Sequence, residues 1–366
     1  MATYFCTGSG SDSGDGTIGN PWTPRSGGKS ALQHALDTIT RSASGDKICL
    51  KQTDTLNATL SLATYGTPTN TGGLLITGYT AIEDDGTFAC AGIDGAGTYA
   101  IWDHSTVEGV KFSNLALGNC GTATVITTDR MCSLTDCKVY GTSGSGWVNA
   151  AENPSAATRV WFDDIGTYGA DSVQYFDDCL FTDGSTNKFD RAVLCNDEPS
   201  FHRCCFLLNA VDTTAAIFVK SSRFAHVTQC SFLHTGGVGS GIDNWLPHTG
   251  GLIKGCLFEG FGTGIKNQAN TYNQSCPIVD CSFFNNTTDY DVARLQELPG
   301  VEKLGATPFD KAGSITAFAD RKTYFNPVDT GSVRSDNLHR GAVQAAAGGG
   351  TGLIGPGGGM IGIGAI

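Results

Sequence analysis

The chain has 366 residues, including 50 glycines and 14 cysteines, and its charged residues sum to −12. Hydrophobic residues make up 40 % of the sequence, which is enough for a large buried core and excludes an intrinsically disordered chain. The acidic balance excludes a nucleic-acid binder, because no basic face can be assembled to neutralise phosphates, and it disfavours anionic membrane surfaces.

The N-terminal residues and the cysteine spacing indicate a reducing compartment. Residues 1–9 contain neither a basic stretch nor an apolar one, so the sequence predicts no signal peptide. No Cys-x-x-Cys pair occurs, which excludes zinc ribbons and thioredoxin-like motifs. We therefore expect a chain made in a cytoplasm with most of its thiols free and buried.

Residues 1–45 are predicted to form an N-terminal segment with a capping helix. Apolar residues recur at helical spacing within residues 30–42, namely Leu32, Ala35, Leu36 and Ile39. Ser30 with Gln33 matches a capping box, and Gly45 follows the expected end. This helix is expected to cover the first coil of the structure that follows.

From residue 46 to residue 290 one hexad recurs: an apolar residue, two further residues, cysteine, one residue and phenylalanine. The copies centre on Cys179, Cys204, Cys230, Cys256 and Cys281, with a weaker copy at Cys137 and a degenerate one at Val110. Apart from one longer step, neighbouring copies are 25 to 27 residues apart, which is typical of a solenoid. Short β-type runs between turn residues favour strands, and about 25 residues suffice for a coil of three short strands. We predict nine or ten coils whose cysteines stack as buried free thiols.

A second pattern, an apolar residue followed by any residue and asparagine, ends at Asn149, Asn196, Asn244 and Asn267. The steps of 47, 48 and 23 residues correspond to two coils, two coils and one coil. Asparagine at one corner of stacked coils can donate to the neighbouring turn and tolerates a left-handed bend. This pattern predicts an asparagine ladder.

The step from Cys137 to Cys179 is 42 residues, which we interpret as one coil plus an insertion within residues 141–175. This segment contains Trp147, Trp161 and Tyr168. Aromatic rings on an irregular loop suit sugar stacking or protein contacts, so these three are the expected ligand-binding or partner-binding residues. The alternative is that the rings pack on the solenoid wall.

The period is lost after residue 290. A short helix is expected from Asp291 to Leu298, and residues 291–344 are expected to form a C-terminal cap or small unit. Residues 345–366 form a glycine-rich tail, and no charge occurs from Gly341 onward. Its large apolar residues are Leu353, Ile354, Met360, Ile361, Ile363 and Ile366. Glycine and proline disfavour a membrane span, so we expect this tail to pack against a partner or symmetry mates, with a disordered tail as the alternative.

Several segments resemble right-handed parallel β-helix proteins of the pectate-lyase-like superfamily. The resemblance lies in Asp15–Trp22, Ala31–Asp37, Gly45–Ile48 and the two ladders, and in the closing pieces Pro308-Phe309, Tyr324-Phe325 and Arg340–Gln344. It extends over roughly residues 3–345 and implies an all-β, right-handed parallel β-helix. Such folds carry lyases, hydrolases, epimerases, tailspikes and structural proteins, so the resemblance implies little about activity.

A catalytic set is not evident. The Asn-Thr-Asp, Gly-His-Gly and Arg-Ile-Lys tripeptides of polygalacturonase-like hydrolases are missing from the sequence. Two acidic pairs remain as hydrolase candidates, Asp163-Asp164 and Asp177-Asp178. A lyase similar to pectate lyases would hold Ca²⁺ with these four carboxylates and Asp171, and would use Lys188 or Arg191 as the base. No other cofactor and no His-based metal site is expected.

We interpret the chain as a non-catalytic virion structural protein of a bacteriophage, used for capsid decoration or as a host-attachment fibre and assembled in the host cytoplasm. The expected partners are two further copies in a homotrimer, other capsid or tail proteins, and surface glycans. The alternative is a carbohydrate-active enzyme, either a tailspike depolymerase or a polysaccharide lyase. A second alternative is a cell-surface adhesin.

Overall fold

The computed structural model describes residues 1–9, 14–25, 28–66, 73–104, 109–128, 131–150, 154–196, 198–220, 225–244, 251–267, 276–291, 295–297, 300–309, 311 and 313–325. The expected assembly tail, residues 345–366, lies outside these residues, as does the second part of the expected cap, residues 326–344. No helix of the described chain is long and apolar enough to cross a membrane.

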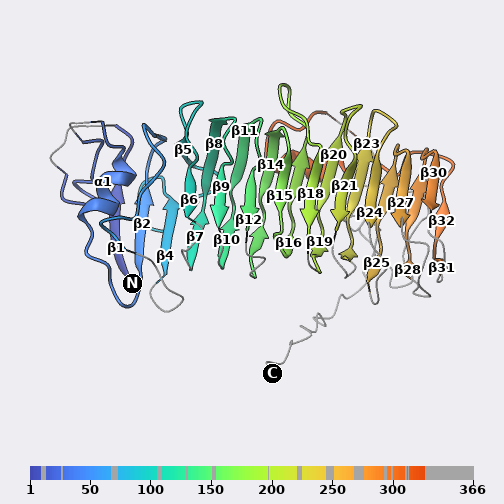
Figure 1. Ribbon diagram of the computed structural model, residues 1–366, viewed down its shortest axis with the longest axis horizontal. Helices are drawn as coiled ribbons and strands as arrows, with labels where there is room; N and C mark the ends of the chain where they lie inside the picture. The colour runs from blue at the N-terminus through green and yellow to red at the C-terminus, as the bar shows by residue number, and fades with distance from the viewer. Residues whose placement is uncertain are drawn as a thin grey trace, which may run out of the picture.

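The described strands form three parallel sheets that wind into a right-handed β-helix, and the predicted fold class is confirmed (Figure 1). Sheet 1 contains β1 (Ala2–Cys6), β2 (Asp46–Leu50), β4 (Leu74–Gly78), β7 (Val110–Ser113), β10 (Cys132–Thr135), β13 (Ala156–Thr158), β16 (Tyr175–Asp177), β19 (Ser200–His202), β22 (His226–Thr228), β25 (Leu252–Lys254), β28 (Cys276–Val279) and β31 (Leu295–Glu297).

The other two sheets take their strands from the same coils. Sheet 2 contains β3 (Asp54–Thr55), β5 (Ala91–Asp94), β8 (Leu115–Gly121), β11 (Lys138–Thr142), β14 (Trp161–Ile165), β17 (Leu180–Thr182), β20 (Cys205–Leu208), β23 (Ser231–His234), β26 (Leu257–Glu259), β29 (Ser282–Phe284) and β32 (Glu302–Lys303). Sheet 3 contains β6 (Trp102–His104), β9 (Ile126–Thr128), β12 (Trp147–Asn149), β15 (Tyr168–Asp171), β18 (Arg191–Cys195), β21 (Ala215–Val219), β24 (Ser240–Asn244), β27 (Thr263–Asn267) and β30 (Thr288–Asp291). Nine coils of the described chain therefore supply a strand to every sheet.

The N-terminal helix α1 (Ala31–Thr38) caps the first coil, with Leu32 and Leu36 fully buried. Ser30 accepts a hydrogen bond from the Gln33 N–H at 3.2 Å, as the capping pattern predicts. The buried Asp54 of β3 accepts two further bonds, from the N–H groups of Ala31 and Leu32 at 3.0 and 2.8 Å. The Asp54 carboxylate thus pairs with two backbone N–H groups that have no partner within the helix, and it joins the helix N-terminus to the solenoid.

In the eight coils that begin with β7 to β28, the chain turns from sheet 1 into sheet 2 through one residue in the left-handed region. The eight residues of this left-handed row are Asn114, Asp136, Arg159, Asp178, Arg203, Gln229, Gly255 and Asp280, with φ between 50° and 64°. A left-handed residue reverses the chain sharply, so that the residue after it points directly into the core. In most of the coils after Asn114 that next residue is cysteine.

The cysteine ladder predicted at this corner is confirmed. Cys137, Cys179, Cys204, Cys230, Cys256 and Cys281 are all buried and free. Each thiol donates across the left-handed turn to the carbonyl two residues earlier; for example, the Cys137 Sγ lies 3.2 Å from the Thr135 oxygen. Cysteine therefore serves as a small core residue that also satisfies a turn carbonyl.

The main stack of the core is formed by the phenylalanines that lie two residues after the corner cysteine or its replacement, Val160. The rings of Phe162, Phe181, Phe206, Phe232, Phe258 and Phe283 follow one another with centroids 4.6 to 5.2 Å apart. The residue between cysteine and phenylalanine points outward, because side chains alternate along a strand. Sheet 2 therefore has an inner aromatic row and a separate outer row.

The prediction of an insertion within residues 141–175 is wrong. Leu134, Ala157 and Phe176 are partners in sheet 1, so the step of 42 residues contains two coils of 23 and 19 residues. The sequence pattern missed the additional coil because Val160 replaces cysteine and Ala157 replaces a large apolar residue. The segment continues the solenoid wall and does not project from it.

Three further details correct the sequence prediction. Val110 pairs with Cys132 rather than with Cys137, so the degenerate copy was placed out of register. In sheet 3, Cys195 pairs with Val219 and Val219 with Asn244, which puts Asn196 one residue outside the asparagine row. The asparagine ladder is therefore reduced to the neighbouring pair Asn244 and Asn267, with Asn149 several coils away.

The third detail is the end of the solenoid. Instead of the helix expected over residues 291–298, the chain adds β31 and β32 to sheets 1 and 2. Beyond β32, residues 304–325, which we call the strap, return along the outer face of sheet 2 (Figure 1). The strap includes the short helices η1 (Phe318–Asp320) and α2 (Arg321–Tyr324).

Replacement of Phe232 by alanine is predicted to lower the free energy of unfolding by about 3–5 kcal/mol, because it leaves a cavity between two stacked rings. Denaturant titration followed by circular dichroism measures this loss. Tyr175→Ala serves as the control, since that ring is 49 % exposed and its removal should change stability by less than about 0.5 kcal/mol. Equal losses in the two variants would contradict the stacked core.

The ladder thiols are predicted to resist alkylation in the native protein. Burial raises the pKa of Cys137 to about 12, so its reactive thiolate is scarce at pH 8. Thiol titration of native protein should leave the six ladder cysteines unmodified, and titration in denaturant should count all 14 thiols of the chain. Fewer thiols in denaturant would reveal disulfides and refute the free ladder.

Candidate functional site

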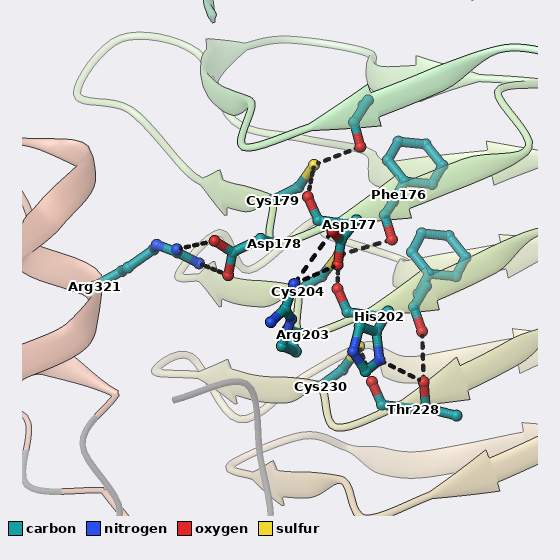
Figure 2. Close-up of polar contacts among 12 residues, drawn as sticks. Phe176, Asp177, Asp178, Cys179, His202, Arg203, Cys204, Thr228, Cys230 and Arg321 are labelled. Atoms are coloured by element: carbon teal, nitrogen blue, oxygen red, sulfur yellow. Dashed lines mark hydrogen bonds and ion pairs between the residues drawn. The ribbon is translucent and has the colours of Figure 1, made fainter. Parts of the chain in front are cut away.

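The acidic pair Asp177 and Asp178 lies at the corner between sheets 1 and 2, and its two carboxylates point in different directions (Figure 2). Asp177 extends over the outer face of sheet 1, where the Arg203 Nη2 donates to both of its oxygens at 3.0 and 3.2 Å. Asp178 belongs to the left-handed row and receives two hydrogen bonds from the strap residue Arg321, at 2.8 and 2.6 Å. The pair holds two guanidinium groups and joins separate parts of the chain.

The remaining acidic candidates lie apart from this pair and have partners of their own. The Thr182 hydroxyl donates to Asp163 at 2.6 Å, and Lys138 approaches the other Asp163 oxygen at 2.9 Å. Asp164 accepts the backbone N–H groups of Thr186 and Asn187 at 2.9 and 2.7 Å. These contacts fix the turn after sheet 2.

Asp171 lies on sheet 3 and accepts a hydrogen bond from Ser172 at 2.8 Å, while burial raises the pKa of its carboxyl group. The five carboxylates thus occupy different faces of the solenoid. Within the described chain, no three His, Cys, Asp or Glu side chains come together in a way that could hold a metal ion. The carboxylate cluster expected for the calcium-dependent alternative is therefore not formed by these residues.

The expected aromatic site is also dispersed. Trp147 is fully buried in the solenoid core, where its Nε1 donates to the Thr128 hydroxyl at 3.1 Å. Trp161 lies on the outer row of sheet 2 beneath the strap, and its Nε1 donates to Thr182 at 2.7 Å. The prediction that these two rings face a ligand is wrong, because both point into packed interiors. Tyr168 alone is partly exposed, on the outer face of sheet 3.

The structure brings Tyr168 together with Arg191 on sheet 3. The two are direct partners in neighbouring strands, and the Arg191 Nη1 lies 3.4 Å from the Tyr168 hydroxyl. The Arg191 guanidinium stacks over the Phe218 ring at 4.3 Å and lies 3.4 Å from the Asp190 carboxylate. Lys188, the other predicted base, instead donates to the Gly184 carbonyl in the preceding turn.

From Arg191 a groove of about 760 Å³ follows the outer face of sheet 3 across five successive coils, β18 to β30. At the usual strand spacing of about 4.8 Å these coils span roughly 20 Å. The floor contains Phe218, Asp243 and Lys266 from three consecutive strands. Hydroxyl groups form most of the remaining wall, from Thr213, Thr214, Ser240, Thr263, Thr287 and Thr288.

Charges of both signs meet in this groove. The Lys266 ammonium lies 3.7 Å from the Asp243 carboxylate, and the polar contacts of Arg191 with Asp190 and Tyr168 are long, at 3.4 Å each. Such distances are at the outer limit of direct hydrogen bonding, so these cations can turn toward a ligand without losing a strong bond. Val211, which is largely exposed, and Asp212 stand at the rim.

A second hollow of about 510 Å³ adjoins the groove at Val211 and Asp212. Two of its lining residues, Phe189 and Asn209, donate their backbone N–H groups to the Asp183 carboxylate at 2.9 and 2.7 Å. Phe218, Asp243 and Lys266 are not among the candidate residues predicted from the sequence. Asp243 and Lys266 occupy the middle position of the asparagine pattern, which was the one available signal that they share a row.

The chain was compared with protein families, curated sequences and solved structures. No protein-family model matches the chain, and no curated protein sequence matches it. Among solved structures, the crystal structure of pectate lyase Pel9A is similar, with a TM-score of 0.46 and 10 % sequence identity. The similarity extends over 94 % of this chain and 97 % of that one.

Proposed function

We propose that the protein binds an extended glycan along the groove of sheet 3. The observation that carries this proposal is the floor of the groove, where hydroxyl and charged side chains recur on successive coils from Arg191 to Thr288. A polysaccharide repeats its hydroxyl groups at regular intervals and can therefore offer similar groups to successive coils. Sugar hydroxyls pair with the types of side chain found there: carboxylate, guanidinium, ammonium and hydroxyl.

Binding is supported better than catalysis by the side chains available. The acidic candidates Asp177 and Asp178 are engaged by Arg203 and Arg321 on the far side of the coil from the groove. The groove itself offers Asp243 and Asp212 as carboxylates and Arg191 and Lys266 as cations. A glycan-degrading enzyme, the alternative from the sequence, would have to use these residues, and release of reducing ends during the binding experiment would favour it.

Replacement of Arg191 by glutamine is predicted to weaken glycan binding by roughly tenfold or more, because a charge-assisted hydrogen bond to a ligand contributes about 1.5–3 kcal/mol. Affinity electrophoresis through gels containing dextran, alginate or polygalacturonate measures the retardation of each variant. Arg203→Gln removes the same charge from the opposite face and should leave retardation unchanged. Equal effects of the two substitutions, or no retardation by any glycan tested, would refute the groove as the site.

A second candidate function places this groove on a bacteriophage particle, as a trimeric decoration or attachment protein. The sequence from Gly341 to Ile366 supports it, because a 26-residue stretch with no charge and six large apolar side chains has no role in a finished solenoid core. Glycine allows such a stretch to approach other backbones closely around a symmetry axis.

Deletion of residues 346–366 is predicted to leave the β-helix folded and to abolish its oligomerisation. Circular dichroism and melting temperature should remain those of the full chain, since the described core lies within residues 1–325. Light scattering coupled to size exclusion measures the mass of both proteins. A truncated protein with the mass of the full-length assembly would show that the tail is not the assembly element.

A further inference from the structure

The strap lies across a face of sheet 2 that would otherwise be exposed and apolar. After β32, the Leu304 N–H donates to the Phe283 carbonyl at 2.8 Å, and the chain then turns back toward earlier coils. The outer row of sheet 2 provides Trp161, Leu180, Cys205 and Leu257, and the strap covers this row with Phe309 and Phe325. All six side chains are buried.

The first part of the strap is held by Glu259 at the end of β26. This carboxylate is buried, and it accepts a hydrogen bond from the Thr307 hydroxyl at 2.7 Å and an ion pair from Lys311. Further along, the Phe318 ring stacks on Phe88 with centroids 4.5 Å apart. The strap thus spans from the last coils back to the loop before β5.

The last part of the strap is fixed by Arg321, whose guanidinium makes the bidentate contact with Asp178 (Figure 2). The Arg321 side chain is only 4 % exposed and also lies over the Phe318 ring at 4.4 Å. In Figure 2 the arginine projects from the strap helix toward the solenoid, and Asp178 meets it from the left-handed turn. This contact joins residues 143 positions apart.

The strap and the coils have separate interiors. The buried side chains of Phe309 and Phe325 belong to a cluster with the outer row of sheet 2, whereas the cysteine and phenylalanine rows belong to the solenoid core. Removal of the strap would therefore uncover one outer row without opening the stacked interior. Among the residues thus uncovered, Cys205 carries a thiol that can report the event.

We propose that residues 304–325 are a releasable strap, with the Arg321–Asp178 ion pair as its latch, and that release bares Cys205 and the apolar row of sheet 2 while the coils remain folded. The strap therefore ends beside the coil of Asp178 and not at the end of the solenoid. The latch controls the exposure of an apolar surface on sheet 2.

Alkylation of Cys205 in the native full-length chain tests the proposal. Arg321→Gln should increase its labelling rate by roughly tenfold or more, because the substitution leaves a partly buried carboxylate without its partner and raises the population of the open strap. Asp178→Asn should act similarly, since asparagine keeps the left-handed turn while losing the charge. Arg203→Gln is the matched control: it breaks the neighbouring Asp177 pair but does not touch the strap.

Peptide mapping by mass spectrometry follows the modification, and Cys205→Ser in the Arg321→Gln background identifies the thiol. The supporting result is selective labelling that disappears with Cys205→Ser while Cys179 and Cys230 stay unmodified. Labelling no faster than in Arg203→Gln would overturn the latch. Simultaneous labelling of the core cysteines would overturn the independence of the strap, because it would mean that the coils open together with it.

Discussion

The left-handed residue between sheets 1 and 2 is the constraint on which the rest of the structure depends. One residue with φ near +55° reverses the chain without a loop, so consecutive coils superimpose and their strands pair in parallel. A non-glycine residue in this region has an energetic cost, which the structure meets in seven of the eight positions with Asn, Asp, Arg or Gln. Their polar side chains also form ion pairs, as Arg159 does with Asp136 and Asp178 does with Arg321.

The contents of the core follow from this turn. The side chain after it enters a narrow corner, where a small apolar group that can donate to a nearby carbonyl is favoured, and cysteine meets both conditions. Two residues later there is room for a ring, and rings on coils one strand spacing apart stack almost in parallel. The intervening residue must face outward, which creates the apolar row that the strap covers.

The dependence of the core on this turn explains how much of the structure could be predicted from the sequence. The β-helix, its capping helix and the thiol ladder could be predicted because they depend on residues that recur at a fixed period. The coil around Ala157 and Val160 could not be predicted, since alanine replaces the large apolar residue of the hexad and valine replaces its cysteine. The groove was missed because outward positions such as Phe218 and Lys266 carry no periodic requirement. The Arg321–Asp178 contact has no local signal, because neither residue belongs to a pattern that refers to the other.

The course of the strap has a mechanical consequence. In a parallel β-helix, the hydrogen bonds between coils lie along the long axis, so tension on the final coil would peel strands away one at a time. Here the strap returns from β32 across the outer face of sheet 2 and is secured at the coil of Asp178. A pull applied at Phe325 would therefore shear the strap along sheet 2 before it reached the last coils, and sheet 3, which holds the groove, would stay out of its path.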